Sequence, residues 1–368
     1  MKSNYKKLGE IIRQVDERNI KGEDFALFGV SITKDFIKSV ANIIGTDLRQ
    51  YKTVKKGQFV CSLMQVSRDE KIPIALWNKD EIIIVSPAYK VFEVKDESVI
   101  LPEYLSLWFK RTEFDRESSY YGVGGVRGSL EWEDFCYMEV PVPEIEEQKK
   151  IVEAYKTIEK RIALKRKIND NLESQAYTIY MDWFIDNGEQ HGATNCSLSD
   201  VFEIFDSRRI PLSSQERAER EKIYPYYGAA GLLDYVDNFI FDGIFVLMGE
   251  DGSVVTEEGY PYLQYIWGQF WVNNHAHILQ GKNGISTETL YLILKKTNIK
   301  EFVTGAVQAK MSQENLRSIP TITLKQDELA KFDSLIQPIF NLIRNNRSEI
   351  EKLEELKQQL QGKLSSSI

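Results

Sequence analysis

The sequence repeats the stretch Gly124-Gly125-Val126-Arg127-Gly128-Ser129-Leu130 as Gly305-Ala306-Val307-Gln308-Ala309-Lys310-Met311, 181 residues further along the chain. The alignment continues without a gap: Glu133 meets Glu314, Phe135 meets Leu316 and Met138 meets Ile319. A short β-like stretch and then a helical pattern follow in each copy. Self-similarity at a fixed shift indicates an internal repeat. We therefore predict one unit present twice, a globular domain followed by a long helix.

Both helical patterns place residues in register at the a and d positions of a heptad, which over more than four heptads is typical of a coiled coil. The apolar seam residues that we expect to pack there are Ile151, Tyr155, Ile158, Ile162, Leu172, Ile179, Ile336, Ile339, Ile343, Ile350, Leu353 and Leu360. The seam is polar near its middle, at Lys165, Asn169 and Asn346. If the two helices pair in antiparallel fashion, these polar positions should lie near one another.

Each helical pattern covers nearly 40 residues, or roughly 55–60 Å at the usual rise per residue. Pro338 lies in the second pattern, so we expect a kink there or a later start of that helix. A compact helical bundle is the alternative to a coiled coil. It is disfavoured because few other long helical patterns exist to complete such a bundle.

The predicted fold class is α+β, with two mixed, mostly β domains at residues 1–145 and 186–325. Residues 146–185 and 326–368 are the two helices, and the repeat predicts a pseudo-twofold, antiparallel arrangement. Strand-like runs occur at 58–63, 82–85 and 244–248, and helix-like stretches at 105–110 and 290–295. The middles of the two domains differ in length and content. A shared framework with unlike interiors suits two domains that do one job on two targets.

The formal net charge is −8, which argues against a protein that coats nucleic acid by charge alone. No apolar run approaches the roughly 18–20 residues of a membrane span, and no apolar segment follows the N-terminus as in a secretory signal. The cysteines Cys61, Cys136 and Cys196 are far apart and odd in number. We expect buried, reduced thiols in a cytoplasmic protein, not a disulfide framework or a metal site.

Further motifs lie outside the repeat anchors. They are Tyr224-Pro225-Tyr226-Tyr227-Gly228-Ala229-Ala230-Gly231-Leu232-Leu233-Asp234-Tyr235-Val236 with Asp242-Gly243 and Glu250-Asp251-Gly252; Val85-Ser86-Pro87-Ala88-Tyr89-Lys90-Val91-Phe92 with its looser echo Asn273-Asn274-His275-Ala276-His277-Ile278-Leu279; and Val140-Pro141-Val142-Pro143-Glu144-Ile145-Glu146-Glu147-Gln148-Lys149-Lys150-Ile151-Val152. A chain with these motifs in the order domain, helix, domain, helix resembles the specificity (HsdS-like) subunit of a type I restriction–modification system. The resemblance covers essentially the whole chain. It departs at Lys325-Gln326-Asp327-Glu328-Leu329, where a proline and a Glu-Gln pair are usual.

The resemblance implies a non-catalytic subunit that gives a methyltransferase complex its DNA specificity. Each globular domain would be a target-recognition domain that recognises one half of a bipartite target in double-stranded DNA. The helices would set the spacing between the halves and dock two methyltransferase subunits. The resemblance leaves open whether ATP-dependent restriction subunits join the complex.

The sequence gives no catalytic motif, so we expect no enzyme activity and no cofactor. The (Asn/Asp)-Pro-Pro-(Tyr/Phe) tetrapeptide of adenine methyltransferases is absent, and Gly362-Lys363 lacks the upstream glycine of a phosphate-binding loop. His275 and His277 are two residues apart, which on a strand places both on one face. No third metal ligand is evident near them in the sequence. We therefore expect them to be structural or to face DNA, and predict no metal site.

Candidate DNA-binding residues follow from what base edges and phosphates accept: Arg and Lys pair with guanine, and Asn and Gln with adenine. For the first domain the candidates are Lys34, Arg49, Lys55, Lys56, Arg68 and Arg127. For the second they are Arg208, Arg209, Arg217, Arg220, Tyr227, Gln308 and Lys310. The densest basic run, around Lys165, could neutralise phosphates over the spacer or meet an acidic partner surface.

Two alternatives remain at this point. One is the specificity subunit of a fused, type IIB-like restriction–methylation enzyme, which differs in its partner genes and not in this sequence. The other is a duplicated coiled-coil scaffold without a DNA role. The scaffold is disfavoured because a symmetric scaffold does not need unlike domain interiors.

Overall fold

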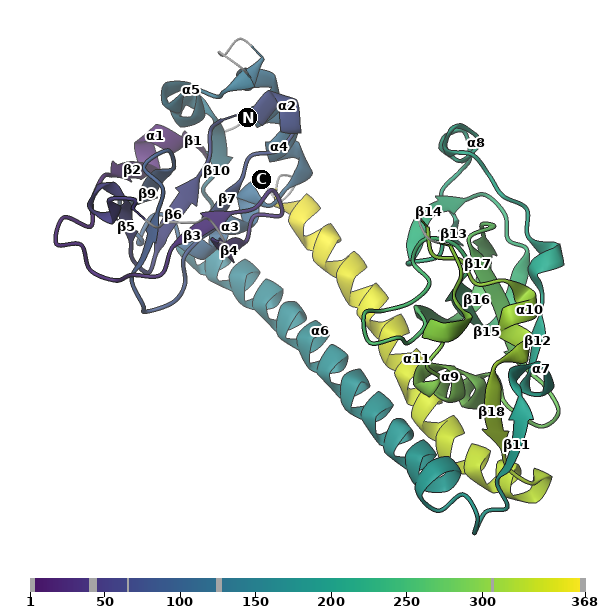
Figure 1. The fold of residues 1–368 in the computed structure, drawn as a ribbon. Helices are drawn as coiled ribbons and strands as arrows, with labels where there is room; N and C mark the ends of the chain where they lie inside the picture. The colour runs from purple at the N-terminus through teal and green to yellow at the C-terminus, as the bar shows by residue number, and fades with distance from the viewer. Residues whose placement is uncertain (1–3, 40–44, 65, 124–127, 306–307, 365–368) are drawn as a thin grey trace. The chain divides into compact units, whose positions relative to one another are not determined.

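The computed structural model describes residues 4–39, 45–64, 66–123, 128–305 and 308–364. The chain divides into two compact units, residues 1–164 with 349–368, and residues 165–348. Two long helices, α6 (Ile145–Tyr180) and α11 (Gln326–Lys363), each contribute to both units (Figure 1). The predicted division of the chain into two domains and two helices, with boundaries at 145, 185 and 325, remains a prediction.

The first unit holds a four-stranded antiparallel sheet in the order β2-β9-β6-β7 and three two-stranded ribbons, β1–β10, β3–β4 and β5–β8. Its strands are β1 (Tyr5–Lys7), β2 (Ile12–Val15), β3 (Phe28–Val30), β4 (Phe36–Lys38), β5 (Lys52–Val54), β6 (Gln58–Cys61), β7 (Ile74–Leu76), β8 (Ile83–Val85), β9 (Lys90–Val94) and β10 (Glu139–Pro141). Its shorter helices are α1 (Leu8–Ile11), η1 (Leu48–Gln50), α2 (Val66–Asp69), α3 (Pro102–Phe109), α4 (Thr112–Gly122) and α5 (Trp132–Tyr137).

The second unit is built on a six-stranded sheet in the order β12-β17-β15-β16-β13-β14, with a separate ribbon of β11 and β18. Its strands are β11 (Thr194–Ser197), β12 (Phe202–Ile204), β13 (Tyr224–Tyr227), β14 (Leu232–Val236), β15 (Phe241–Gly249), β16 (Leu263–Val272), β17 (Ala276–Gly281) and β18 (Pro320–Thr323). Its helical segments are a π-helical turn η3 (Met181–Asp186), α7 (Leu198–Val201), η4 (Asp206–Arg208), α8 (Ser214–Ala218), α9 (Thr287–Lys296), η5 (Lys300–Phe302) and α10 (Gln313–Ser318).

The two units share a topology that extends beyond the repeated sequence. In each, the first strand pairs with the strand that precedes a long helix: Tyr5 lies opposite Pro141, and Thr194 opposite Thr323. A one-turn helix then leads into the first strand of the larger sheet, β2 or β12. The predicted strands at 58–63, 82–85 and 244–248 correspond to β6, β8 and β15, and the predicted short helices to α3 and α9. The α+β prediction is thereby confirmed.

Helix α9 illustrates how local sequence fixes an element. The Ser286 side chain caps it by accepting a hydrogen bond from the Thr289 backbone N–H at 3.1 Å. Lys295 and Lys296 occupy its last turn, where cations interact favourably with the helix dipole. Its buried face, which includes Leu290 and Ile293, packs into the core of the second unit. Burial of this face contributes most of the stability of so short a helix.

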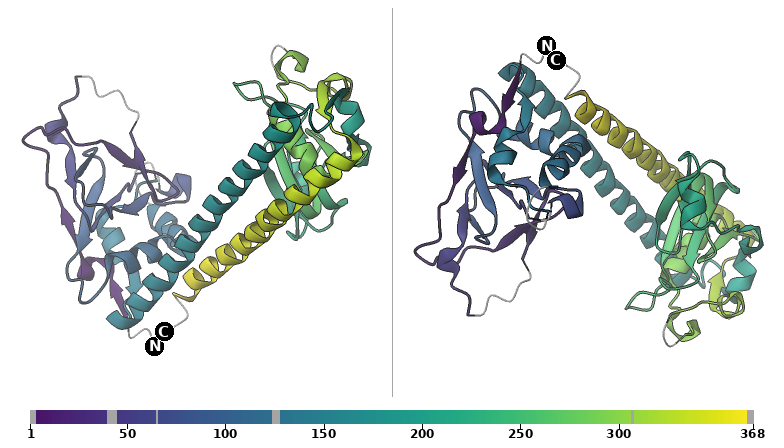
Figure 2. Two further views of the ribbon diagram at one scale, coloured as in Figure 1. Left: turned by 90° about the horizontal axis from the view of Figure 1, so that it is seen from below. Right: turned by 90° about the horizontal axis from the view of Figure 1, so that it is seen from above.

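Opposite ends of the two long helices enter each core. In the first unit, Tyr155 of α6 packs in one cluster with Leu360 of α11 and with Leu364, which directly follows α11. In the second unit, Tyr180 of α6 packs with Phe332 of α11. The start of one helix therefore pairs with the end of the other, which confirms the antiparallel pairing. Figure 2 shows α6 and α11 side by side in two further views.

The seam residues predicted from the heptad pattern are buried or partly buried. Tyr155, Ile158, Ile162, Ile336, Ile343 and Leu353 are buried, and Ile151, Leu172, Ile179, Ile339, Ile350 and Leu360 are intermediate. The polar positions meet as expected. Asn346 donates to Asn169 Oδ1 at 2.8 Å and accepts from Lys165 Nζ at 3.0 Å.

Of the two alternatives expected at Pro338, a kink or a later start of the second helix, the later start is wrong. Helix α11 begins at Gln326 and continues through Pro338. A proline inside a helix removes one backbone hydrogen bond, at a cost of about 3 kcal/mol. Leu329, Phe332 and Ile336, which precede it, are buried in the core and offset that cost. Among the described residues, none of the helices combines the length and the hydropathy of a transmembrane segment.

Candidate nucleic-acid interface

Four of the basic residues predicted for the first domain are exposed, and each forms an ion pair with a carboxylate. The pairs are Arg49–Asp47 (2.9 Å), Lys55–Glu17 (2.5 Å), Lys56–Asp80 (2.7 Å) and Arg68–Asp69 (2.8 Å). Hydrogen bonds from Arg49 lower the pKa of the Asp47 carboxyl. Exposed ion pairs of this kind contribute little to stability, because water and salt screen them. A phosphate or a base edge can therefore replace the carboxylate at small cost.

Lys34 does not fit its predicted role. Its side chain is only 5% exposed, and its ammonium group lies 2.8 Å from the Asp115 carboxylate and donates to the backbone carbonyl of Phe109. Burial lowers the pKa of Lys34, and the hydrogen bond from its ammonium group to Asp115 opposes that effect. The ammonium is thus committed to the interior, where a DNA base cannot reach it. Arg127, with the first copy of the glycine-rich loop at 124–127, lies outside the described residues.

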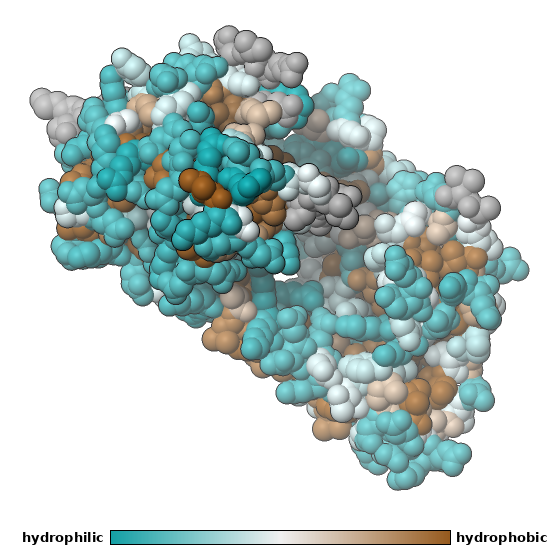
Figure 3. Space-filling view, turned by 60° about the vertical axis from the view of Figure 1, so that its left-hand side comes forward, coloured by the Kyte–Doolittle hydropathy of each residue, from teal (hydrophilic) through white to brown (hydrophobic). Residues whose placement is uncertain are grey.

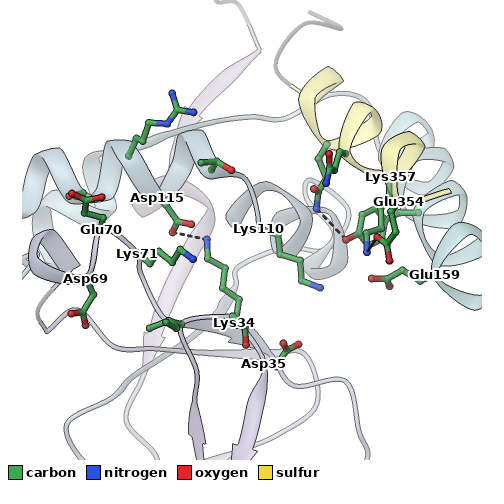
Figure 4. Close-up of a pocket in the computed structure, with 18 residues that line it drawn as sticks. Lys34, Asp35, Asp69, Glu70, Lys71, Lys110, Asp115, Glu159, Glu354 and Lys357 are labelled. Carbon is green, nitrogen blue, oxygen red and sulfur yellow. Dashed lines mark hydrogen bonds and ion pairs between the residues drawn. The ribbon is translucent and has the colours of Figure 1, made fainter. Parts of the chain in front are cut away.

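The Lys34–Asp115 pair lies in the wall of a polar cleft of about 1060 Å³ in the first unit. Figure 4 shows Lys71 and Lys110 beside this pair, with Glu159 and Glu354 from the long helices across the cleft. Groups of both charge signs line the cleft. It therefore lacks the uniformly basic surface that phosphate binding requires.

In the second unit, two of the predicted arginines, Arg217 and Arg220, lie beside strands β13 and β14, and Arg208 lies beside the start of β15. Arg217 lies 3.3 Å from Asp234 and stacks over the Tyr226 ring, and Arg220 lies 2.9 Å from Asp237. Arg208 is exposed, donates to the Ile240 carbonyl at 2.8 Å and lies over the Phe241 ring. Tyr227, also on β13, is partly buried with its ring against Phe270.

Gln308 and Lys310 belong to a stretch in which Thr304 and Lys310 lie opposite each other. Residues 306 and 307 of this stretch are outside the described part of the chain. Thr304 and Lys310 exchange two backbone hydrogen bonds, at 2.9 and 2.8 Å, which close the turn. Gly305 has a φ of +94°, and a Cβ there would lie 2.0 Å from the Gln308 carbonyl oxygen. The turn therefore requires glycine at this position. Both candidate side chains are exposed on it.

The two neighbouring histidines have different environments. His277 is fully buried, with Nδ1 at 2.6 Å from Asp206 and Nε2 at 2.9 Å from the Met311 carbonyl oxygen. The His275 side chain is 51% exposed, 3.7 Å from Asp251. Of the two roles expected for these residues, His277 therefore has the structural one.

Asp206, Glu250 and His277 place potential metal-ligand atoms within 4.8 Å of one another, although the sequence shows no third ligand near the histidines. The guanidinium of Arg209 already lies in this cluster, 2.5 Å from Glu250 and 3.5 Å from Asp206. It supplies the positive charge that a metal ion would bring. This interior position also makes Arg209 unsuited to its predicted contact with DNA.

The first unit has a related pair at the equivalent place. Asp16 directly follows strand β2, and Asp206 lies two residues after the end of strand β12. Lys52 Nζ lies 3.2 Å from the Asp16 carboxylate. Hydrogen bonding to Lys52, the largest effect on this group, lowers the pKa of Asp16. Lys52 also donates to the Tyr89 carbonyl at 3.0 Å. In both units an acidic residue after the first sheet strand binds a buried cation.

The cysteines match their prediction only in part. All three are free, but only Cys61 is buried, whereas Cys136 and Cys196 are partly accessible. Burial raises the pKa of each thiol. None therefore has the depressed pKa of a reactive cysteine.

The family model described as the type I restriction modification DNA specificity domain matches residues 5–174 and, a second time, residues 192–355. The chain belongs to this family. Each match begins at or just before the first strand of one unit, β1 or β11, and ends inside a long helix. Membership of the type I specificity family favours neither the fused-enzyme nor the scaffold alternative.

Individual members of the type I specificity family are similar to the chain over different lengths. A Haemophilus influenzae protein named type I restriction enzyme specificity subunit S.HindORF215P is 37% identical over 123 residues, 33% of this chain and 31% of that relative. The MjaIX specificity subunit of Methanocaldococcus jannaschii is 22% identical over 297 residues, 72% of this chain and 68% of that relative. The alignment with the first of these relatives thus spans about a third of its length.

A solved structure supports the fold. The type I restriction–modification S subunit from M. genitalium superposes with a TM-score of 0.57 at 14% identity, covering 98% of this chain and 95% of that one. At this identity the likeness concerns the fold alone, and it agrees with two globular units and two long helices.

Proposed function

We propose that the chain is the DNA sequence-specificity subunit of a type I restriction–modification complex. Each globular unit recognises one half of a bipartite target in double-stranded DNA, and the two helices set the distance between the halves. The observation that carries the proposal is the double family match, once over each unit and its helix. The shared sheet framework with unlike loops supports it, because different loops on one framework recognise different base sequences.

Exposed and partly exposed polar residues supply the proposed DNA contacts. The exposed ones are Arg49, Lys55, Lys56 and Arg68 in the first unit and Arg208, Gln308 and Lys310 in the second, and the partly exposed ones are Arg217, Arg220 and Tyr227. Most of the cations are paired with carboxylates, which keeps affinity for arbitrary DNA low in a chain with a net charge of −8. DNA then replaces each carboxylate by a phosphate or a guanine edge.

The helices supply the proposed docking surface for two methyltransferase subunits. Hydrophilic side chains cover most of the face shown in Figure 3, with hydrophobic ones in separate small groups. On the helices, Leu164 is 58% exposed, Leu356 49%, and Leu335 and Leu342 46% each. Exposed leucines on a helix pair whose seam is already filled are available to a partner. In this role the chain itself is non-catalytic and acts in the cytoplasm.

Genome-wide adenine methylation, compared with and without the gene, tests the function. We expect a bipartite motif that disappears on deletion, and an unchanged methylation pattern contradicts the proposal. Exchange of residues 186–325 for the corresponding domain of another family member should change one half of the motif and keep the other. Leu356→Glu with Leu164→Glu should weaken co-purification of the methyltransferase, whereas Glu351→Gln, on the exposed surface of the same helix, should not.

A further inference from the structure

Three polar side chains on one face of α11 connect that helix to the rest of the second unit. Asp333, Gln337 and Arg344 are separated by four and then seven residues, so they project from α11 in nearly the same direction. The three positions cover roughly 16 Å of the helix. They contact α9 and strand β16, and all of these segments belong to residues 165–348.

Arg344 makes the central contact. Its guanidinium donates to the Glu288 carboxylate at 2.6 Å and to the Tyr265 hydroxyl, which itself donates to the same carboxylate oxygen at 2.8 Å. Gln337 donates to the other oxygen of Glu288 at 3.1 Å. The side chain of Glu288 is 4% exposed and that of Arg344 is 15% exposed. Helix α11, helix α9 and strand β16 therefore meet at one buried ion pair.

Asp333 makes a second polar contact between α11 and α9. Its carboxylate accepts hydrogen bonds from the Ser286 hydroxyl at 2.6 Å and from the Thr289 hydroxyl at 2.8 Å. Ser286 is the N-cap of α9, and Thr289 lies in its first turn. The first turn of α9 is thus bound to α11 at two points, by Asp333 and, through Glu288, by Arg344.

Apolar packing holds α11 on this unit but does not fix its position. The Phe340 ring packs against the rings of Tyr265 and Tyr291, with centroids 5.1 and 6.0 Å apart. Such contacts are non-directional, so a helix slides or turns over them at small cost. The ion pair has one geometry: a shift of α11 would leave Glu288 buried without its cation, which is strongly unfavourable. The polar contacts therefore select one position of α11.

We propose that Arg344 is a positioning residue that fixes the spacer length of the DNA target. It holds the second recognition unit at one place on α11, and other residues recognise the bases. One extra base pair between the halves moves a half-site by about 3.4 Å along the DNA and turns it by about 35°. A unit held at several polar points does not follow such a turn. This inference rests on the proposed function, in which the helices set the distance between the halves.

The first test uses Arg344→Met in the full chain, together with its methyltransferase partner, and sequencing of the methylated sites gives the motif. Methionine keeps an apolar stem but not the guanidinium. We expect both half-sites to keep their bases, while sites with one base pair more or fewer between them become methylated. The preference for the original spacing should fall about tenfold, the scale of one mismatched base pair. An unchanged spacing in a folded Arg344→Met chain overturns the positioning role.

Lys331→Met is the matched control. Lys331 lies on the same helix, its side chain is 63% exposed, and it pairs with Glu328 three residues earlier. The substitution thus removes one cation from the exposed surface of α11 and should leave the spacing unchanged. If Lys331→Met broadens the spacing as much as Arg344→Met does, the effect belongs to the charge of the helix and the positioning role is overturned.

Asp333→Ala covers the case in which Arg344→Met does not fold. It removes the contact with Ser286 and Thr289 but leaves the buried pair of Arg344 and Glu288 in place. The same neighbouring spacings should become methylated, to a smaller extent than a loss of the ion pair would allow. An Asp333→Ala chain that methylates only the original spacing then overturns the inference.

Binding to DNA duplexes separates positioning from direct contact. The affinities of the wild-type and Arg344→Met complexes are compared on duplexes with the original spacing and with one base pair more or fewer, at several salt concentrations. The ratio between spacings should fall, while the slope of log affinity against log salt stays the same. A slope reduced by about one makes Arg344 a phosphate contact and overturns the positioning role. A wild-type complex without any bipartite motif contradicts the proposed function instead.

Discussion

Lys165 Nζ donates to Asn346 Oδ1 at 3.0 Å, and the two residues are separated by 181 positions, the same shift that relates the two copies of the repeat. Equivalent residues of two antiparallel helices contact each other only where a twofold axis crosses the pair. The hydrogen bond therefore marks the pseudo-twofold axis of the helix pair. The two equivalent residues at this axis are a lysine and an asparagine, so the symmetry is not exact there. Asn346 also donates a hydrogen bond to Asn169 Oδ1 at 2.8 Å.

Asn346→Ala should destabilise the helix pair. The change removes the acceptor of one Lys165 hydrogen bond and the donor to the buried Asn169 Oδ1, and a buried polar atom that loses its partner costs about 1–3 kcal/mol. The free energy of unfolding of the second unit, measured by urea denaturation, should fall by this amount. Asn345→Ala, one residue away and exposed, should change the stability by only a few tenths of a kcal/mol. Equal effects of the two substitutions would contradict the buried polar contact.

Lys34→Met should reduce stability and not DNA specificity. It leaves the Asp115 carboxylate buried without its cation, which costs about 3–5 kcal/mol when one partner of a buried pair is removed. The unfolding midpoint of the first unit should fall. If the variant unfolds normally but changes the methylated motif, Lys34 contacts DNA after all.

Lys56→Gln should weaken DNA binding about equally for all sequences. Lys56 is exposed and pairs with the exposed Asp80, so we expect it to contact a phosphate. Loss of one phosphate contact should reduce the slope of log affinity against log salt by about one. Binding measured at several salt concentrations gives the slope. A slope that remains unchanged shows that Lys56 does not contact a phosphate.

The second unit should lose stability in acid partly through Glu288. Burial raises the pKa of Glu288, but hydrogen bonds from Gln337, Tyr265 and Arg344 outweigh burial and hold it below its ordinary 4.5. A carboxyl whose pKa is lower in the folded state than in the unfolded state stabilises the fold, and this stabilisation is complete at a pH above the unfolded-state pKa. That contribution is lost as the pH falls through the folded value.

Denaturant midpoints measured from neutral pH down to about pH 3 test the role of Glu288. Glu288→Gln should lower stability at neutral pH and flatten the acid branch of the profile. The exposed Glu351→Gln serves as the comparison and should leave the profile unchanged. An acid branch of the same steepness in Glu288→Gln would assign the acid sensitivity to other groups.

Local patterns in the sequence predicted the repeat, the antiparallel helix pair and several strands, because each is written in contiguous residues with a period of 3.5 or 2. Of the two alternatives expected at Pro338, a kink or a later helix start, the later start was wrong, for a tertiary reason. The three apolar residues Leu329, Phe332 and Ile336 anchor the first turns of α11 in the core, which outweighs the local cost of the proline.

The candidate site was predicted less well, because side-chain partners come from distant parts of the chain. Lys34 looks like an exposed loop lysine, yet its partner Asp115 is 81 positions away. His277 meets Asp206 only because β17 pairs with β12. The available clue was the apolar setting of His277 in Ala276-His277-Ile278-Leu279, which is typical of a strand buried on both faces.

Leu364, directly after α11, is buried in the same core as Leu8 of the first unit. During synthesis the ribosome makes the amino-terminal domain long before the helix that completes its core, whereas residues 165–348 form the second unit from one continuous stretch. Domains ordinarily fold as units, amino-terminal first. In this chain the apolar surface of the first unit that Leu360 and Leu364 cover stays exposed until α11 has been synthesised.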